Sequence, residues 1–485
     1  MSFFAALTDE WQGFLESHMV KETEIKLRVS RQTLDALREH PLLNARRQGD
    51  WQTSTLYNQY YDSAERALST ARVALRLRRD GEQFIQTLKS RGQSVAGLSE
   101  RNEWDWYLSQ PALDLNLLDD QCWPQALAEL DKTQLQPVFT TDFQRTRAML
   151  CWERDGESVE VEAALDLGKV LAGEREEPIC ELELEIRQGP AEALLELAEA
   201  LAADLPLMPC DISKAERGYR LFDPASYELR PASPDWQSTT AVDEVIHNGG
   251  WQLLGQTQRL AEQYRHTRQW KLFRELSQQL AELRAYFGVF DLGMPRSAAA
   301  PFIAPLDALL QRFRPLVLAG WADDQDGQAA RDAAPEVFDQ AIAEPAWGQL
   351  FIGLALWLQR RQWCQGRPPR GDKVGQLELA RWLLAACAKE IQELRVPHAN
   401  DPDGMASEWV DQLPRLGRLH FLLVNFRRWL EVPEADRLYG ELNKLQALLE
   451  QYPLVEAEQH PALLAALRKQ GQRVRRLDAW RELNN

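Results

Sequence analysis

Charged and uncharged residues alternate along the stretch KETEIKLRVS, residues 21–30. Glu22, Glu24, Lys26 and Arg28 occupy one parity, and threonine or aliphatic residues occupy the other. Because successive side chains of an extended strand point to opposite faces, this period of two predicts a β-strand with all its charges on one face. The charges would stand about 7 Å apart along that face. Any fold of this chain has to accommodate such a row of charges.

The same alternation recurs in five further segments of the first half of the chain. Their charged positions are Arg76 and Arg78, Arg101 and Glu103, Arg145 and Arg147, Glu160 and Glu162, and Glu181, Glu183 and Glu185. Each segment alone fits a half-buried strand with a solvated face. Solvated faces usually mix their charges, because like charges that are adjacent on one face repel. Here acidic and arginine-rich strands are segregated, which favours a barrel whose charged faces point inward.

A lumen of this kind could bind both a metal ion and a polyanion. Carboxylates on one wall supply the hard oxygen ligands that Mg²⁺ or Mn²⁺ prefers. Arginine and lysine on the opposite wall neutralise phosphate oxygens.

The sequence changes character near residue 230. Before it, short alternating segments are separated by turn signals such as Asp80-Gly81, which indicates an antiparallel sheet. The proline-punctuated stretch FDPASYELRPASPDW then predicts a linker, and beyond it apolar residues recur at helical spacing, for example Phe273, Leu276 and Leu280. The predicted parts are an N-terminal extension (1–18), a β domain (19–222), a linker (223–237) and a helical domain (238–485).

Composition excludes several classes of function. The net charge of −17 argues against a surface devoted to nucleic acid or anionic lipid. The six cysteines are widely spaced and form no C-x-x-C pair, which indicates reduced thiols and no zinc site. The apolar runs are shorter than the roughly 20 residues that span a bilayer, and the N-terminus lacks the basic region of a signal peptide. We therefore expect a cytoplasmic protein without nucleic-acid or membrane partners.

The segment ETEIK matches the E-x-E-x-K signature of the CYTH superfamily, the triphosphate tunnel metalloenzymes, which this chain resembles over residues 19–222. Further matching segments follow in order: NQYYDS, LRLR, TLKSR, SERNEWD, TDFQRTR, ALDLG, EPICELELE and DISKAERGY. The resemblance implies an α+β chain with an eight-stranded antiparallel β-barrel whose lumen binds linear triphosphate. The helical half resembles a CHAD domain, and bacterial proteins of this two-domain architecture are inorganic triphosphatases.

The resemblance also implies roles for individual residues. The divalent-metal carboxylates would be Glu22, Glu24, Glu181 and Glu183, with Glu185 as an alternative to Glu181. The bases that hold phosphate oxygens would be Lys26, Arg76, Arg78, Lys89, Arg145, Arg147 and Lys214. Further lumen candidates are Arg101, which could also bind substrate, with Glu103, Glu162 and Asp166. Glu22, Glu24, Lys26, Arg76 and Arg78 would form the catalytic centre.

The implied reaction is the metal-dependent hydrolysis of inorganic triphosphate to pyrophosphate and phosphate. The sequence contains no G-x-x-x-x-G-K-[ST] loop and no recognisable covalent nucleophile, in keeping with electrostatic catalysis. Two alternatives stay open. One is a nucleotide or thiamine triphosphatase, including class IV adenylate cyclase. The other is a polyphosphate-binding scaffold, against which the metal carboxylates argue.

The helical half departs from the CHAD pattern of a histidine followed by several arginines. The run RELSQQLAELRAYF keeps Arg284, with Arg274 near the histidine position. The run VDQLPRLGRLHFLL keeps Arg418 and carries His420 where arginine is usual. We therefore expect a helical scaffold, with polyphosphate binding as the alternative. A residual basic cluster would lie on one helix face at Arg468, Gln472, Arg475 and Arg476.

The N-terminal segment MSFFAALTDEWQGFLES allows two interpretations. Its aromatic and aliphatic residues stand near helical spacing, which is typical of an amphipathic helix docked on the barrel. It could equally be upstream translation from a wrong start site, with Met19 as the true start.

Overall fold

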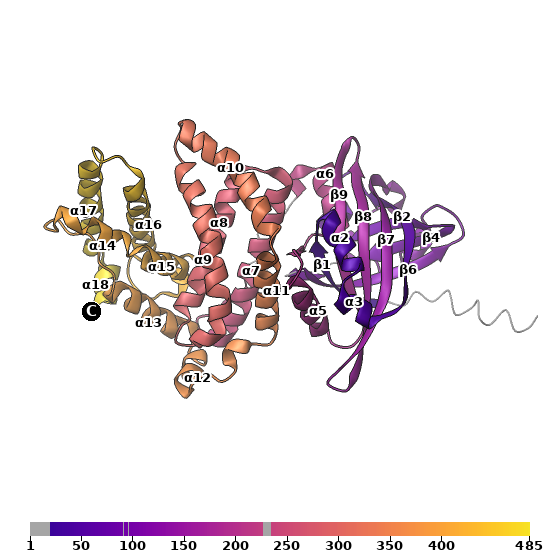
Figure 1. Ribbon diagram of the computed structural model, residues 1–485, viewed down its shortest axis with the longest axis horizontal. Coiled ribbons are helices and arrows are strands. Elements are labelled where there is room, and N and C mark those ends of the chain that lie inside the picture. Colours follow the sequence, from indigo (N-terminus) through magenta and orange to yellow (C-terminus); the bar gives the residue numbers. More distant parts are fainter. Residues whose placement is uncertain (1–19, 91, 96, 227–233) are drawn as a thin grey trace, which may run out of the picture. The chain divides into compact units, whose positions relative to one another are not determined.

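The computed structural model describes residues 20–90, 92–95, 97–226 and 234–485 (Figure 1). These residues form two compact units. The first takes in the described residues of Met1–Leu229 together with Ile342–Gly353, and the second takes in those of Arg230–Ala341 and Leu354–Asn485. The N-terminal segment 1–18 and residues 227–233 of the predicted linker lie outside the described residues. The predicted domain boundaries therefore stay predictions.

The first unit is a closed antiparallel β-barrel, which confirms the predicted fold class. Its eight strands follow one another around the barrel in the order β1-β9-β8-β7-β2-β3-β4-β6, and pairing of β1 with β6 closes it. Their bounds are β1 Val20–Arg28, β2 Arg47–Asp62, β3 Ala74–Asp80, β4 Gln83–Lys89, β6 Leu98–Leu108, β7 Gln136–Arg154, β8 Glu157–Ala172 and β9 Arg175–Gln188. Two short strands, β5 (Gln93–Val95) and β10 (Met208–Pro209), pair with β6 and β1.

Two apolar covers bury the outer face of the barrel. Helices α2 (Arg31–Arg38), α3 (Pro41–Arg46) and α5 (Glu192–Ala202) pack against β1, β7, β8 and β9 (Figure 1). On β3, β4 and β6, the outward Leu75, Leu88, Trp104 and Trp106 lie beneath Leu118, Trp123 and Leu127 of the segment that leads to β7. The short helix α4 (Ala67–Thr70) contributes Leu68 to the same cluster. These covers explain why the alternate parity of the strands is apolar.

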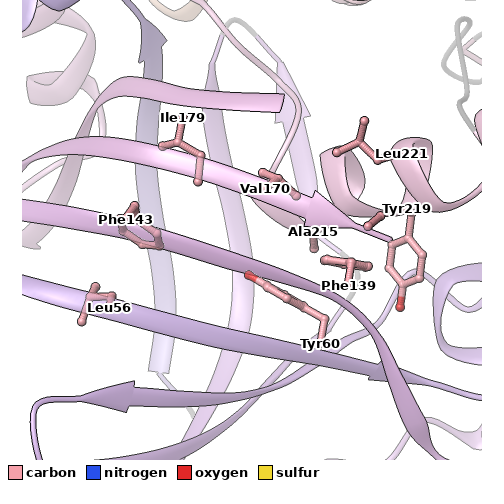
Figure 2. Close-up of a cluster of buried hydrophobic side chains, with 10 residues drawn as sticks. Leu56, Tyr60, Phe139, Phe143, Val170, Ile179, Ala215, Tyr219 and Leu221 are labelled. Atoms are coloured by element: carbon pink, nitrogen blue, oxygen red, sulfur yellow. The ribbon is translucent and has the colours of Figure 1, made fainter. Parts of the chain in front are cut away.

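A helix also packs against the inner face of the barrel wall. Helix α6 (Lys214–Phe222) begins with a capping box, in which Ser213 and Glu216 satisfy each other's backbone N–H groups. Its apolar residues Ala215, Tyr219 and Leu221 meet an apolar layer contributed by β2, β7, β8 and β9 (Figure 2). That layer contains Leu56, Tyr60, Phe139, Phe143, Val170, Ala172 and Ile179. The interior is therefore charged in one part and apolar in another, whereas the sequence predicted only the charged part.

The second unit is helical, as predicted. Its helices, including α11, which extends into both units, are α7 Val242–Thr267, α8 Trp270–Val289, α9 Arg296–Ala319, α10 Gln325–Ile342, α11 Pro345–Gln359, α12 Pro369–Gly375, α13 Leu379–Gln392, α14 Ala406–Val410, α15 Leu413–Phe426, α16 Ala435–Gln451, α17 His460–Arg476 and α18 Asp478–Asn484. The predicted stripe on α8, including Phe273, Leu276 and Leu280, is buried against α7, α9 and α15.

No single described helix combines the length and the apolar composition needed to cross a bilayer. Helices α10 and α11 meet that test only when taken together, and the chain bends by 66° between them.

Candidate active site

The barrel contains a cavity of about 330 Å³ whose lining is mostly charged. All eight barrel strands and the start of α6 contribute to it. Every residue predicted for the site lines this cavity except Asp166 and Glu181. The strand parity read from the sequence therefore identified the inner face, although the roles assigned to these residues stay predictions.

Strand register builds the acidic wall. Across β1 and β9, Glu24 stands opposite Glu185, Lys26 opposite Glu183 and Arg28 opposite Glu181. Across β8 and β9, Glu185 stands opposite Glu162 and Glu181 opposite Asp166. Direct partners in an antiparallel pair have side chains on the same face at about 5 Å. The carboxylates of three strands are thus brought together in two groups.

The first group, Asp166, Glu181 and Glu183, is buried, and one oxygen of each carboxylate lies within 4.8 Å of the others. The Lys214 ammonium donates to all three, at 2.7 Å to Asp166 and 2.9 Å to Glu183. Arg145 donates to Asp166 at 2.8 Å and 2.6 Å and also to Glu183. Burial would raise the pKa of Glu183, but Lys214 and Arg145 hold it well below its usual range. The protein itself therefore supplies the cations for this group, and a metal ion there would have to displace Lys214.

All three members of the second group, Glu22, Glu24 and Glu185, line the cavity, and each pairs with one basic side chain. Lys89 lies 2.7 Å from Glu22, and Lys26 pairs with Glu24. Burial raises the pKa of Glu185 to about 8; Arg187 and Lys89 offset part of this effect, and the charges of Glu22 and Glu24 add to it. Carboxylate oxygens gathered at a cavity wall fit a hard divalent cation. Glu185 is therefore better placed than Glu181 to bind a metal ion in the cavity, because Glu185 lines the cavity and Glu181 does not.

Three arginines of the basic wall, Arg78, Arg101 and Arg147, form no ion pair with any described residue, and Arg101 donates from Nε to Ser99 Oγ at 2.9 Å. Arg78 donates from Nε to the amide oxygen of Asn58 at 2.8 Å. Arg147 lines the same cavity, and within the described ranges no hydrogen bond or ion pair engages its side chain. Burial, together with the positive charges of Arg76 and Arg145, lowers the pKa of Arg78 to about 10. An anion in this position would relieve that repulsion.

Several lining residues were missed from the sequence. Asp105 and Arg187 continue the charged parity of β6 and β9, so the alternation could have identified them. Arg187 lies 2.5 Å from Glu185 and 3.3 Å from Glu162. Tyr60 could not be identified, because an aromatic residue at a strand position is read as core.

A buried cluster at Glu177 holds α6 against the barrel. Glu177 accepts hydrogen bonds from Arg28 at 2.9 Å, Arg217 at 2.7 Å and Arg220 at 2.8 Å. Burial would raise the pKa of Glu177, but these three guanidinium groups together lower it far below its usual range. Arg217 also donates to Glu181 at 2.8 Å. Glu181 is therefore tied to this structural cluster, which explains why it does not line the cavity.

The arginines that the sequence singles out in the helical unit are largely engaged by contacts within the protein. Arg284 lies 2.7 Å from Asp307, and Arg418 lies 2.9 Å from the buried Glu390. In the predicted basic cluster, Arg468 lies 2.6 Å from Asp403, and Arg475 donates to the carbonyl of Val396 at 2.9 Å. The guanidinium of Arg274 stacks on Trp321 at 3.9 Å, and His420 Nδ1 lies 2.8 Å from Asn443 Oδ1. These contacts leave less positive charge for an external polyanion than the sequence alone suggests.

Comparison with known proteins identifies relatives of the barrel. Residues 20–219 match the CYTH domain family. An inorganic triphosphatase of Haemophilus influenzae is 33% identical over 207 residues, which are 43% of this chain and 56% of the relative. The chain thus spans about half the length of that relative, and the resemblance of the helical half to CHAD domains stays a prediction.

Two solved structures that resemble this chain cover less than half of it. The HpAC1 protein of Hippeastrum is 21% identical with a TM-score of 0.31, and covers 41% of this chain and 96% of its own. The PH1819 protein of Pyrococcus horikoshii is 17% identical with a TM-score of 0.23, and covers 37% of this chain and 89% of its own. Similarity at this level carries no functional argument. The barrel-forming residues 20–219 therefore match the CYTH domain family, and part of this chain is similar in sequence to an inorganic triphosphatase.

Proposed function

We propose that this chain hydrolyses inorganic triphosphate to pyrophosphate and phosphate in the barrel cavity, with Mg²⁺ or Mn²⁺ as cofactor. The observation that carries the proposal is the division of the cavity. One part holds the carboxylates of Glu22, Glu24 and Glu185, and another holds Arg78 and Arg147 without acidic partners. The relationship to an inorganic triphosphatase supports the same substrate class.

The cavity suits the electrostatics of phosphoryl transfer. A linear triphosphate carries several negative charges, which must be neutralised before water can attack a terminal phosphorus. Arg78 and Arg147 would bind phosphate oxygens, and Arg76 adds positive charge beside them. Glu22, Glu24 and Glu185 would hold the divalent metal, which when bound neutralises and polarises phosphate oxygens. The enclosing barrel limits competing water, which strengthens these interactions.

Release of phosphate from four substrates tests the proposal. The substrates are inorganic triphosphate, ATP, thiamine triphosphate and long-chain polyphosphate, each with Mg²⁺, with Mn²⁺ and with a chelator. We expect release from triphosphate that requires metal and exceeds release from the others. Preference for ATP or thiamine triphosphate would favour the nucleotide or thiamine alternative, and absence of release from triphosphate at saturating metal would refute the proposal.

A matched pair of variants locates the activity. Arg147→Gln removes a cavity cation, and turnover should fall on the order of 10²-fold, as for loss of a key electrostatic group. Lys169→Gln removes a half-exposed cation that pairs with Glu176 outside the cavity lining. Its activity should match that of the wild type. Equal activity of all three proteins would show that hydrolysis occurs elsewhere.

A further inference from the structure

Arg78 and Arg101 differ from the acid-paired cations of the cavity, because each donates from Nε to a neutral side chain, which for Arg101 is Ser99 Oγ at 2.9 Å. Arg145 lies 2.6 Å from Asp166, Lys89 lies 2.7 Å from Glu22, and Arg76 lies 3.5 Å from Glu103. Arg78 is held instead by a neutral group, since its Nε donates to Asn58 Oδ1 at 2.8 Å. Within the described ranges its two terminal nitrogens donate to no protein acceptor.

Asn58 is fully buried, and both ends of its amide are engaged. Its Nδ2 donates to Thr141 Oγ1 at 2.9 Å, while its Oδ1 accepts from Arg78. Guanidinium groups only donate hydrogen bonds, so the amide oxygen must be the atom that faces Arg78. The three residues are direct partners in one row across β3, β2 and β7. The strand register thus places Asn58 beside Arg78, and the hydrogen bond between them orients the guanidinium group.

We propose that Asn58 is a positioning residue that fixes Arg78 by its Nε while leaving the full positive charge and both terminal nitrogens for a phosphate group of the substrate. A carboxylate at this position would orient the arginine equally well, but it would also neutralise it. A neutral amide orients the arginine without neutralising its charge. The inference rests on the proposed function, since it assigns Asn58 to the binding of a triphosphate-type anion.

The test is Asn58→Asp, which keeps the shape of the side chain and adds the charge. We expect the dissociation constant for inorganic triphosphate, measured by calorimetry in chelator without metal, to rise about tenfold or more, because Arg78 then pairs internally. KM should rise similarly, with a smaller change in kcat. Binding should also lose part of its salt dependence, since one fewer cation is open to the ligand.

Two other substitutions separate charge from packing. Gln86→Glu adds the same charge at a fully buried position of β4 that exchanges hydrogen bonds with the backbone of Asp114 and does not line the cavity. It should lower the melting temperature but leave the dissociation constant for triphosphate unchanged. Thr141→Val removes the anchor of the Asn58 amide without adding charge. It should raise KM about threefold, the scale of one net hydrogen bond, and it keeps the proposal testable if Asn58→Asp does not fold.

Binding and hydrolysis together distinguish the two proposals. A wild-type protein that binds triphosphate with the expected Asn58 dependence but hydrolyses none supports the positioning role and refutes the proposed function. A wild-type protein that hydrolyses triphosphate, while Asn58→Asp and Thr141→Val keep wild-type affinity and KM, refutes the positioning role. Equal weakening of binding by Gln86→Glu and Asn58→Asp refutes it as well.

Discussion

Glu24 on β1 and Glu185 on β9 are direct antiparallel partners whose side chains line one cavity. Like charges placed directly opposite each other destabilise a sheet unless a cation lies between or beside them. Lys26 pairs with Glu24, and Arg187 lies 2.5 Å from Glu185. Two residues away along β9, Glu183 is instead tied to Lys214 at 2.9 Å. The acidic residues of this barrel thus divide into a buried group that shares Lys214 and a group whose three members all line the cavity, where an external cation can reach them.

The first prediction distinguishes these two groups by substitution. Glu24→Gln should weaken Mn²⁺ binding and lower triphosphate turnover on the order of 10²-fold, because it removes a ligand charge but keeps the shape. Glu181→Gln should leave Mn²⁺ affinity nearly unchanged. It should instead destabilise the fold by about 3–5 kcal/mol, because it removes an acidic partner of the buried Lys214 and Arg217. Calorimetric Mn²⁺ titration and thermal melting measure the two effects. Loss of Mn²⁺ binding only in Glu181→Gln would place the metal at the Lys214 group.

The second prediction concerns the pH dependence of stability in metal-free protein. The pKa of Glu185 is raised from 4.5 to about 8, so the folded state favours the protonated carboxyl. The resulting stability is fully present below about pH 4.5 and is lost as the pH rises through 8. Glu185→Gln resembles the protonated form at every pH. The melting temperature of this variant should therefore exceed that of the wild type by an amount that grows from about pH 5 and levels off above 8. Parallel melting profiles in chelator would contradict the prediction.

The inner face of the barrel could be predicted because its signal is local. Side-chain parity depends only on the strand itself, so Glu24, Arg78 and Arg147 were assigned to the lumen from short stretches of sequence. The same signal could have included Asp105 and Arg187. It could not separate Glu181 from Glu185, since both share one parity. Their difference arises from α6, because Lys214 and Arg217 donate hydrogen bonds to Glu181 and not to Glu185 among the described contacts.

The apolar layer inside the barrel could not be predicted for a related reason. Leu56 and Tyr60 share the inward parity of Asn58, but apolar residues in a strand are expected on its outer, core-facing side. Helix α6 makes them core residues on the inner side (Figure 2). Sequence shows that such a helix exists but does not show which face of the barrel it covers.

The third prediction is that Gly218 permits α6 to approach the barrel wall. A Cβ at this position would lie 2.1 Å from ring atoms of Phe139, which stacks on Tyr60 at a centroid distance of 4.6 Å. Gly218→Ala should therefore destabilise by about 1–3 kcal/mol, typical of overpacking. It should also reduce triphosphate turnover, because Lys214 moves with the helix.

Two controls accompany this prediction. A Cβ on Gly440, in α16, would meet no atom within 4 Å, so Gly440→Ala should be neutral or slightly stabilising. Adding Phe139→Leu to Gly218→Ala should recover part of the lost turnover, because the smaller side chain makes room for the methyl group. A melting temperature of Gly218→Ala equal to that of Gly440→Ala would show that the close approach is not needed.

The last prediction concerns polyphosphate and the helical unit. Glu390 is buried and accepts hydrogen bonds from Arg415 and Arg418, each at 2.9 Å. An external polyanion would have to compete with this carboxylate, which is already in place. We therefore expect Arg418→Gln to leave the affinity of the full chain for long-chain polyphosphate unchanged.

Glu390→Gln should instead favour polyphosphate binding. It removes the carboxylate that pairs with the partly buried guanidinium groups of Arg415 and Arg418. The variant should be less stable than the wild type, and long-chain polyphosphate should raise its melting temperature more than it raises that of the wild type, through preferential binding to the folded state. Triphosphate hydrolysis in the barrel should be unaffected by the substitution. Lys444→Gln, which removes a half-exposed ion pair to Glu441, serves as the surface control. If polyphosphate stabilises the wild type strongly and Arg418→Gln abolishes that effect, the helical unit binds polyphosphate despite its internal ion pairs.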